Sequence, residues 1–98
     1  MKIRLFFSKF NNLKYISHLD LMRLFLRVLR RSGLPLKFSE GFNPHPKFSI
    51  KRAFKLGVEF FNEEASFELK DSIAIDHVNR AILTQLPEGI EINKLEYA

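Results

Sequence analysis

The sequence has no cysteine and no tryptophan, and glycine and proline occur only four times each in its 98 residues. Without cysteine, the chain forms no disulfide and holds no zinc–thiolate or iron–sulfur centre by itself. It also lacks an apolar run near the roughly 20 residues that a membrane-spanning helix needs, and its first residues do not form a signal peptide. We therefore expect a cytoplasmic protein with no membrane association, no metal and no cofactor.

Apolar residues, by contrast, are abundant. They make up 46% of the chain and include eleven phenylalanines, which is enough for a hydrophobic core and excludes a disordered tail. A chain of 98 residues has room for one such core. The sequence thus predicts a single domain over residues 1–98.

Charge is divided unevenly along the chain. Residues 1–55 contain 13 Lys and Arg but only two carboxylates, whereas residues 56–98 contain nine Asp and Glu but only three Lys and Arg. The net charge of +5 therefore hides a dipolar distribution. A basic region of this kind attracts polyanions, of which nucleic acid is the most common.

The hydrophobic pattern predicts an alternation of strands and helices. Apolar and polar residues alternate along residues 2–9, which indicates a strand with Ile3, Leu5 and Phe7 facing the core. Ser17 is typical of a helix N-cap, and the periodicity of the next residues predicts a helix over 18–31. Similar patterns predict strands at 36–39, 48–54, 65–70 and 90–97, a bend at Gly57 and a second helix at 75–86. This order is typical of the split βαβ, ferredoxin-like fold: an α+β sandwich with an antiparallel sheet and two helices on one face.

Arginines recur along the polar face of the first expected helix. Planar guanidinium groups spaced three and four residues apart lie in a row on one helix flank, and their forks match phosphate oxygens. A solvated outer helix face is the alternative, but such faces usually mix both signs of charge. We therefore expect nucleic-acid binding through Arg23, Arg27, Arg30 and Arg31, with Lys47, Lys51 and Arg52 extending the basic surface.

The segment between residues 39 and 47 is too rich in Pro, Gly and Asn for a regular strand. Two prolines flank His45 and hold it in an extended, rigid presentation. His45 is a candidate general acid or base and Lys47 a candidate oxyanion stabiliser, although a structural loop histidine is the alternative. The loop residues singled out are Glu40, Asn43, Pro44, His45 and Pro46.

The histidines do not form a metal-ligand pattern. His18 lies on the apolar face of the first expected helix and reads as a core histidine that needs a polar partner. A site shared by His18, His45 and a carboxylate has no short ligand spacing to support it, so we predict no metal site.

Two segments carry a resemblance to a known family. Residues 15–23 read YISHLDLMR and residues 39–47 read SEGFNPHPK, and shorter matches occur at 56–59 and 86–90. The chain resembles the radical-SAM-linked family of uncharacterised bacterial proteins. Members occur fused to, or encoded near, a cobalamin-binding radical SAM protein, often beside a ribonuclease.

This resemblance implies a role in RNA modification or RNA metabolism. Family members are longer, so the resemblance implies that this chain corresponds to the N-terminal half or to a short form. Residues 52–55 depart from a segment that is usually proline-rich in the family.

Three functions follow as hypotheses. The first is a non-catalytic accessory module that binds RNA and positions it for a radical SAM or RNA-processing partner, so that the chain is not expected to be an enzyme on its own. The second is a metal-independent endoribonuclease that uses His45 and Lys47. The third is a protein-interaction domain, without nucleic acid, whose basic surface docks an acidic partner.

Overall fold

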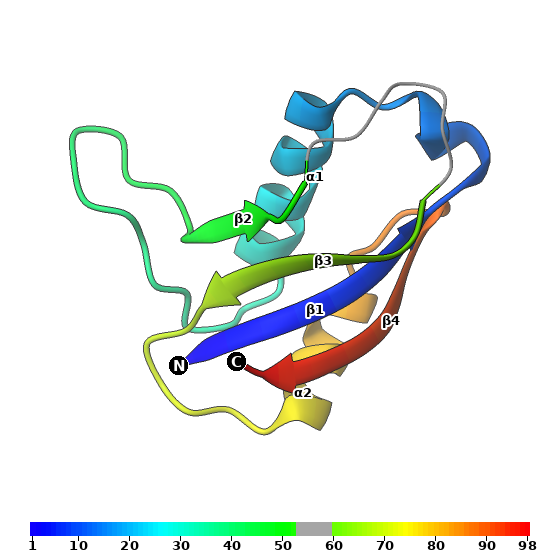
Figure 1. Cartoon of the computed structure of the whole chain (residues 1–98). Coiled ribbons are helices and arrows are strands. Elements are labelled where there is room, and N and C mark those ends of the chain that lie inside the picture. Colours follow the sequence, from blue (N-terminus) through cyan, green and yellow to red (C-terminus); the bar gives the residue numbers. More distant parts are fainter. Residues whose placement is uncertain (53–59) are drawn as a thin grey trace.

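The computed structural model describes residues 1–52 and 60–98, and the chain runs strand, helix, strand, strand, helix, strand (Figure 1). A short 3-10 helix precedes the first α-helix. In order, the elements are β1 (Lys2–Lys9), η1 (Asn11–Tyr15), α1 (His18–Arg31), β2 (Phe48–Ile50), β3 (Phe60–Glu68), α2 (Ile75–Leu83) and β4 (Ile90–Tyr97).

The strands of the described residues form one antiparallel, four-stranded sheet in the order β2-β3-β1-β4. The first strand is thus central, and the chain ends meet beside it, where the Ala98 amide donates to the Lys2 carbonyl at 3.0 Å. Both α-helices cover the same face of the sheet, α1 behind β2 and β3 and α2 behind β1 and β4 (Figure 1). The predicted α+β, ferredoxin-like arrangement is confirmed.

The core lies between the sheet and the helices. Side chains at alternate positions of β1, namely Ile3, Leu5 and Phe7, are at most 1% exposed, as the alternation predicts. The Phe25 ring of α1 packs edge-on against Phe7 at 4.9 Å and against Phe48 at 5.1 Å between ring centroids. Such edge-to-face pairs are worth about 1 kcal/mol beyond their buried area. This aromatic cluster fixes α1 against the sheet.

The ends of α1 are set by local hydrogen bonds. The Ser17 hydroxyl accepts from the Asp20 amide at 3.1 Å, which confirms the predicted N-cap. After Ser32 at the C-cap, the chain turns at Gly33, whose φ of +78° is a left-handed conformation that glycine adopts without strain. Because Leu21, Phe25, Val28 and Leu29 are buried, the arginines of α1 face outward.

Several boundaries differ from those predicted. Residues 36–39 form two isolated bridges, Leu36 to Leu69 and Phe38 to Pro46, instead of a strand, because the proline-rich loop interrupts the ladder. The second helix ends at Leu83, before the turn that leads to Pro87. The third strand begins at Phe60, earlier than expected. Positions 53 and 54 of the expected strand 48–54, the expected bend at Gly57 and the 56–59 motif lie outside the described residues.

The described helices are all short. None of them has both the length and the apolar content that crossing a membrane requires.

Gly89 provides a sharp test of the packing before β4. An added Cβ would lie 2.9 Å from the Phe10 carbonyl oxygen and 2.9 Å from the Leu13 Cγ, and the φ of Gly89 is +95°. We predict that Gly89→Ala lowers the free energy of unfolding by about 3 kcal/mol, as left-handed strain and overpacking add. Urea unfolding measures this change.

The matched control is Gly33→Ala. Its φ is also positive, but no heavy atom of the described residues other than Gly33 and its two chain neighbours lies within 4 Å of the added Cβ. We expect a loss of about 1 kcal/mol, from backbone strain alone. Equal losses in both variants would show that the contact with Phe10 and Leu13 does not constrain Gly89.

Candidate nucleic-acid interface

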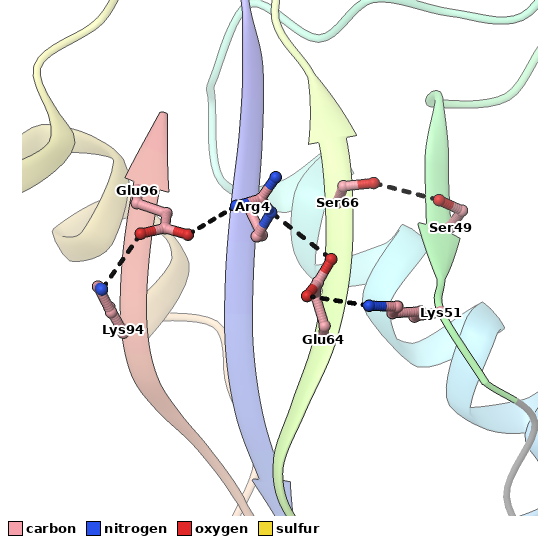
Figure 2. A network of polar contacts seen from close by, with 7 residues as sticks. All are labelled: Arg4, Ser49, Lys51, Glu64, Ser66, Lys94 and Glu96. Atoms are coloured by element: carbon pink, nitrogen blue, oxygen red, sulfur yellow. Dashed lines mark hydrogen bonds and ion pairs between the residues drawn. The ribbon is translucent and has the colours of Figure 1, made fainter. Parts of the chain in front are cut away.

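The open face of the sheet, which neither α1 nor α2 covers, carries a network of ion pairs (Figure 2). Its centre is Arg4 of β1, which bonds Glu96 of β4 at 2.9 Å and lies 3.5 Å from Glu64 of β3. Lys94 lies 3.2 Å from Glu96, and Lys51 lies 3.7 Å from Glu64. Acidic residues from the C-terminal part of the chain thus meet basic residues from its N-terminal part on this face.

The remaining basic residues predicted on and beyond β2 also have carboxylate partners. Lys47 lies 3.9 Å from Glu68, and Arg52 bonds Glu63 at 2.6 Å. Exposed pairs of this kind contribute about 0.2–1 kcal/mol each to stability. Their larger consequence is electrostatic, because Lys47, Lys51 and Arg52 do not present unopposed positive charge to a ligand.

The arginines of α1 differ from these residues. Arg23 approaches Asp20 of its own helix at 3.4 Å, in an exposed contact. For Arg27, Arg30 and Arg31, no ion pair with any residue of 1–52 or 60–98 is found, and all three are exposed. We call Arg23, Arg27, Arg30 and Arg31 the arginine cluster.

The surface around the arginine cluster is hollowed in two places. A hollow of about 380 Å³ is lined by Leu26 and all four arginines of the cluster. A groove of about 290 Å³ lies where the C-terminal ends of α1 and α2 approach each other, and it shares Arg27 and Arg31 with the first hollow. The cationic surface is therefore continuous from the outer side of α1 to the groove between the helices.

The loop around His45 is held at its base by a clasp of hydrogen bonds. The Ser39 amide donates to the His45 carbonyl at 2.8 Å, and the Ser39 hydroxyl accepts from the His45 amide at 3.2 Å. The same hydroxyl lies 3.0 Å from the His45 Nδ1 and is free to donate its own proton there, which orients the ring. The loop projects away from the sheet (Figure 1). Its residues Glu40, Asn43 and Pro44 are exposed, Pro46 is buried, and Phe42 is fully exposed.

His45 lines a further hollow of about 300 Å³ on the open face of the sheet. Lys47 and Glu68 line it, together with Ser49 of β2 and Ser66 of β3, whose hydroxyls are 3.2 Å apart. None of the arginine cluster lines this hollow. The predicted site residues therefore divide between two surfaces: the arginine cluster on the helix layer, and His45, Lys47 and Lys51 on the side of the sheet.

Arg4 and Phe6 do not form an exposed platform on which bases could stack. Phe6 is half-buried, and Arg4 is engaged by two carboxylates.

In the described part of the chain, no group of three or more His, Asp or Glu side chains is placed to hold a metal ion. His18, the first residue of α1, is partly buried.

Sequence reasoning missed two features. The groove between the helices combines arginines of α1 with Thr84 and Gln85, and nothing in the sequence pattern links these segments. Lys9 is fully buried, with its Nζ 3.5 Å from the Lys14 carbonyl oxygen, and burial lowers the pKa of Lys9. Its place in the alternation of β1 was the available signal for burial.

Comparison with known proteins identifies one family. The sequence profile of a family described as "Uncharacterized protein conserved in bacteria (DUF2344)" matches residues 2–98. No curated protein and no solved structure matches the chain.

The network around Arg4 predicts a specific pH dependence. Hydrogen bonds from Arg4, and secondarily from Lys94, lower the pKa of Glu96 below the ordinary value of 4.5. The ionised carboxylate therefore stabilises the fold above that value, and this stability is lost as the pH falls through the lowered pKa. We predict that Arg4→Met raises the pKa of Glu96, as measured by NMR titration of its side-chain carboxyl.

Lys94→Met is the control, and it should raise the same pKa by less, because the bond from Arg4 is the larger cause. The acid-side loss of stability, followed by urea unfolding at several pH values, should shrink more in Arg4→Met than in Lys94→Met. A larger shift in Lys94→Met would refute the central place of Arg4.

Proposed function

We propose, from the premise that the chain belongs to this family of uncharacterised proteins conserved in bacteria, that it is a non-catalytic RNA-binding module. In this proposal it works in the cytoplasm and positions an RNA substrate for a radical SAM or RNA-processing partner. The observation that carries the proposal is the arginine cluster, in which Arg27, Arg30 and Arg31 have no carboxylate partner among the described residues. The proposal of a radical SAM or RNA-processing partner rests on the family resemblance of the two long motifs.

The charge of the cluster supports RNA as the ligand. An arginine already paired with a carboxylate must break that pair before it binds phosphate, whereas an unpaired arginine releases only water and counterions. Arg27, Arg30 and Arg31 lie close together without carboxylate partners among the described residues, so they can contact several phosphates at once. Their spacing on one helix suits a backbone that carries phosphates at regular intervals.

The helix layer is a better candidate surface than the sheet. Open sheets that bind single-stranded RNA present exposed aromatic rings on which bases stack. Here the sheet centre holds Arg4 between Glu64 and Glu96, and Phe6 is half-buried. Carboxylates at this position repel phosphates, so the proposal assigns RNA to α1 and leaves the sheet side to the partner.

Salt dependence tests the arginine cluster. If Arg27, Arg30 and Arg31 each neutralise one phosphate, log affinity for single-stranded RNA should fall against log salt with a slope of about −2. The triple variant Arg27→Ala, Arg30→Ala, Arg31→Ala should lose most of this slope. Fluorescence anisotropy with a labelled single-stranded RNA measures both quantities.

A second triple variant removes the same charge from the sheet side: Lys47→Ala, Lys51→Ala, Lys94→Ala. Because these lysines have carboxylate partners, we expect a slope close to that of the unaltered protein. Equal weakening in both triple variants would reject the arginine cluster as the site. Absence of binding by the unaltered protein at low salt would reject the proposed function.

The hollow beside His45 favours a second candidate function, metal-independent endoribonuclease activity. Such cleavage needs a group that takes the proton of the attacking 2′-hydroxyl and a group that returns a proton to the leaving 5′-oxygen. The His45 imidazole would take the proton of the 2′-hydroxyl and, once protonated, return it to the leaving 5′-oxygen. Ser39 orients its ring, and Lys47 of the same hollow, on leaving Glu68 at 3.9 Å, would stabilise the charged phosphate.

Cleavage assays in EDTA separate this function from simple binding. If the second candidate is correct, the protein cleaves single-stranded RNA in EDTA, and His45→Ala reduces the rate by about 100-fold or more. His77→Ala, which alters an exposed histidine of α2, should keep the full rate. A rate that survives in His45→Ala, or that EDTA abolishes, would dismiss the nuclease function.

A further inference from the structure

The outer edge of β4 is the longer of the two open edges of the sheet (Figure 1). β4 runs over Ile90–Tyr97 and, among the described strands, pairs with β1 alone, whereas the other edge strand, β2, has three residues. An open edge presents a row of amide and carbonyl groups that a further strand can bond. Many proteins keep such edges short or interrupt them with proline, and β4 is neither short nor interrupted in this way.

Hydrogen bonds at the two ends of β4 show which of its backbone groups point outward. The residues that flank β4, Gly89 and Ala98, each form a backbone hydrogen bond of 3.0 Å on the β1 side. Neighbouring residues of an antiparallel strand point their backbone groups to opposite sides, so those of Ile90 and Tyr97 point away from β1. The same alternation, continued inward from both ends along the observed register, gives four outward residues: Ile90, Ile92, Leu95 and Tyr97.

The spacing of these outward residues is symmetric about the middle of β4. A β-bulge, at which the register with β1 shifts, places two residues between Ile92 and Leu95. One of the two is Asn93, whose side-chain amide donates to the Ser8 hydroxyl at 2.9 Å and so holds the bulge in place. The outward backbone groups therefore occur at the same intervals in both directions along the strand. A second β4 that runs antiparallel matches them at every position.

The side chains agree with such a pairing. About a twofold axis through the middle of β4, Ile92 lies opposite Leu95 of the second copy, and Ile90 lies opposite Tyr97 of the second copy. These four residues pair with buried positions of β1, so their side chains lie on the face of the sheet that the helices cover. Apolar and aromatic side chains directly opposite each other on one face stabilise antiparallel pairs.

A hollow at one end of this edge fits the exposed ring of Tyr97. The hollow has a volume of about 350 Å³ and is lined by residues 90–92, together with Leu83 and Leu86. Because consecutive strand residues point to opposite faces, a hollow that all three residues line opens at the edge of the strand. Tyr97 is 55% exposed. Twofold pairing sets the Tyr97 ring of the second copy opposite Ile90, beside this hollow.

Charges on the open face are balanced in the same register. Glu91 is exposed and has no ion pair within residues 1–52 and 60–98. It lies opposite Glu96 of the second copy, which in each chain is 2.9 Å from Arg4 and 3.2 Å from Lys94. Two cations thus accompany two carboxylates at each end of the paired strands, and no net repulsion opposes the pairing.

We propose that the protein associates with a second copy of itself by antiparallel pairing of the two β4 strands, which joins the two four-stranded sheets into one. A second copy is favoured over another peptide because the outward groups are self-complementary and because shared use of one edge closes the assembly at two chains. The twofold axis is normal to the sheet, so both helix layers and both arginine clusters lie on the same side. The inference goes beyond the proposed function and does not depend on RNA binding.

Analytical ultracentrifugation tests this association. We expect the unaltered protein to form dimers with a Kd of about 100 µM or tighter. Tyr97→Glu removes the ring and sets a carboxylate beside Glu88 and Glu91, which line the hollow of the other copy. Because this contact occurs twice in a twofold dimer, Tyr97→Glu should raise the Kd about 100-fold, about tenfold for each contact.

The chain offers two controls. Tyr15→Glu alters the other tyrosine, which is 61% exposed in η1 and outside the β4 edge, and should leave the Kd unchanged. Tyr97→Phe keeps the ring and loses only the hydrogen bond from its hydroxyl to the Ile73 carbonyl, so it should dimerise like the unaltered protein.

Amide hydrogen exchange, followed by mass spectrometry or NMR, locates the interface. The outward amides of Ile92 and Leu95 should exchange about tenfold or more slowly in the dimer than in Tyr97→Glu. The Glu96 amide, which points toward β1, should exchange equally in both and shows that the variant is folded. Dilution of the unaltered protein below its Kd gives the same comparison without a substitution.

The inference is overturned if the unaltered protein stays monomeric at about 1 mM. It is also overturned if a dimer forms in which the Ile92 and Leu95 amides exchange as fast as in the monomer, or if Tyr15→Glu dissociates the dimer as much as Tyr97→Glu. Slower exchange of these amides only in the presence of a different protein would assign the edge to that protein. None of these outcomes bears on RNA binding by the arginine cluster.

Discussion

Antiparallel pairing of β1 with both β3 and β4 is the constraint on which the rest of the structure depends. It places the basic first strand between two acidic strands, so that Arg4 meets carboxylates from both sides. Each exposed ion pair contributes about 0.2–1 kcal/mol, which is small beside the burial of Ile3, Leu5 and Phe7 in the core. The main effect of these pairs is electrostatic, because they neutralise the positive charge of most basic residues on the sheet side.

In the arginine cluster this arrangement leaves positive charge unopposed, because Arg27, Arg30 and Arg31 have no carboxylate partner among the described residues. Its helix lies on the far side of the sheet from the ion-pair network, and the buried face of α1 holds it there through Phe25. Folding thus converts a charge difference along the chain into a difference between two faces. The helix layer becomes the cationic face, while the open sheet face carries both signs of charge in contact.

The loop around His45 belongs to the sheet side and has its own source of order. The bonds between Ser39 and His45 close its base, and the bridge from Phe38 to Pro46 extends the closure by one pair. A loop held in this way presents its exposed residues at low entropic cost. The arginine cluster and this loop are therefore independent features, which separate experiments can address.

Local pattern was sufficient for much of the fold. The alternation of β1 and β4, the Ser17 cap and the apolar face of α1 each lie within one segment, so residues 2–9, 18–31 and 90–97 were predicted with the bounds observed. The order of these elements also predicted the sheet topology, because few topologies satisfy short connections and a single buried face. The ends of α2 and β3 were predicted less well, since their limits depend on turns and on neighbouring strands.

The positions of the arginines on an exposed helix face were determined by the sequence alone, because helical periodicity and burial of the opposite face decide them. Which basic residues keep their charge unopposed was decided only by the tertiary structure. Glu63, Glu64 and Glu68 reach Arg52, Lys51 and Lys47 through strand pairing between segments distant in the chain. The groove that joins Arg27 and Arg31 to Gln85 likewise exists only because α1 lies beside the segment that follows α2, and no periodicity within either helix encodes that proximity.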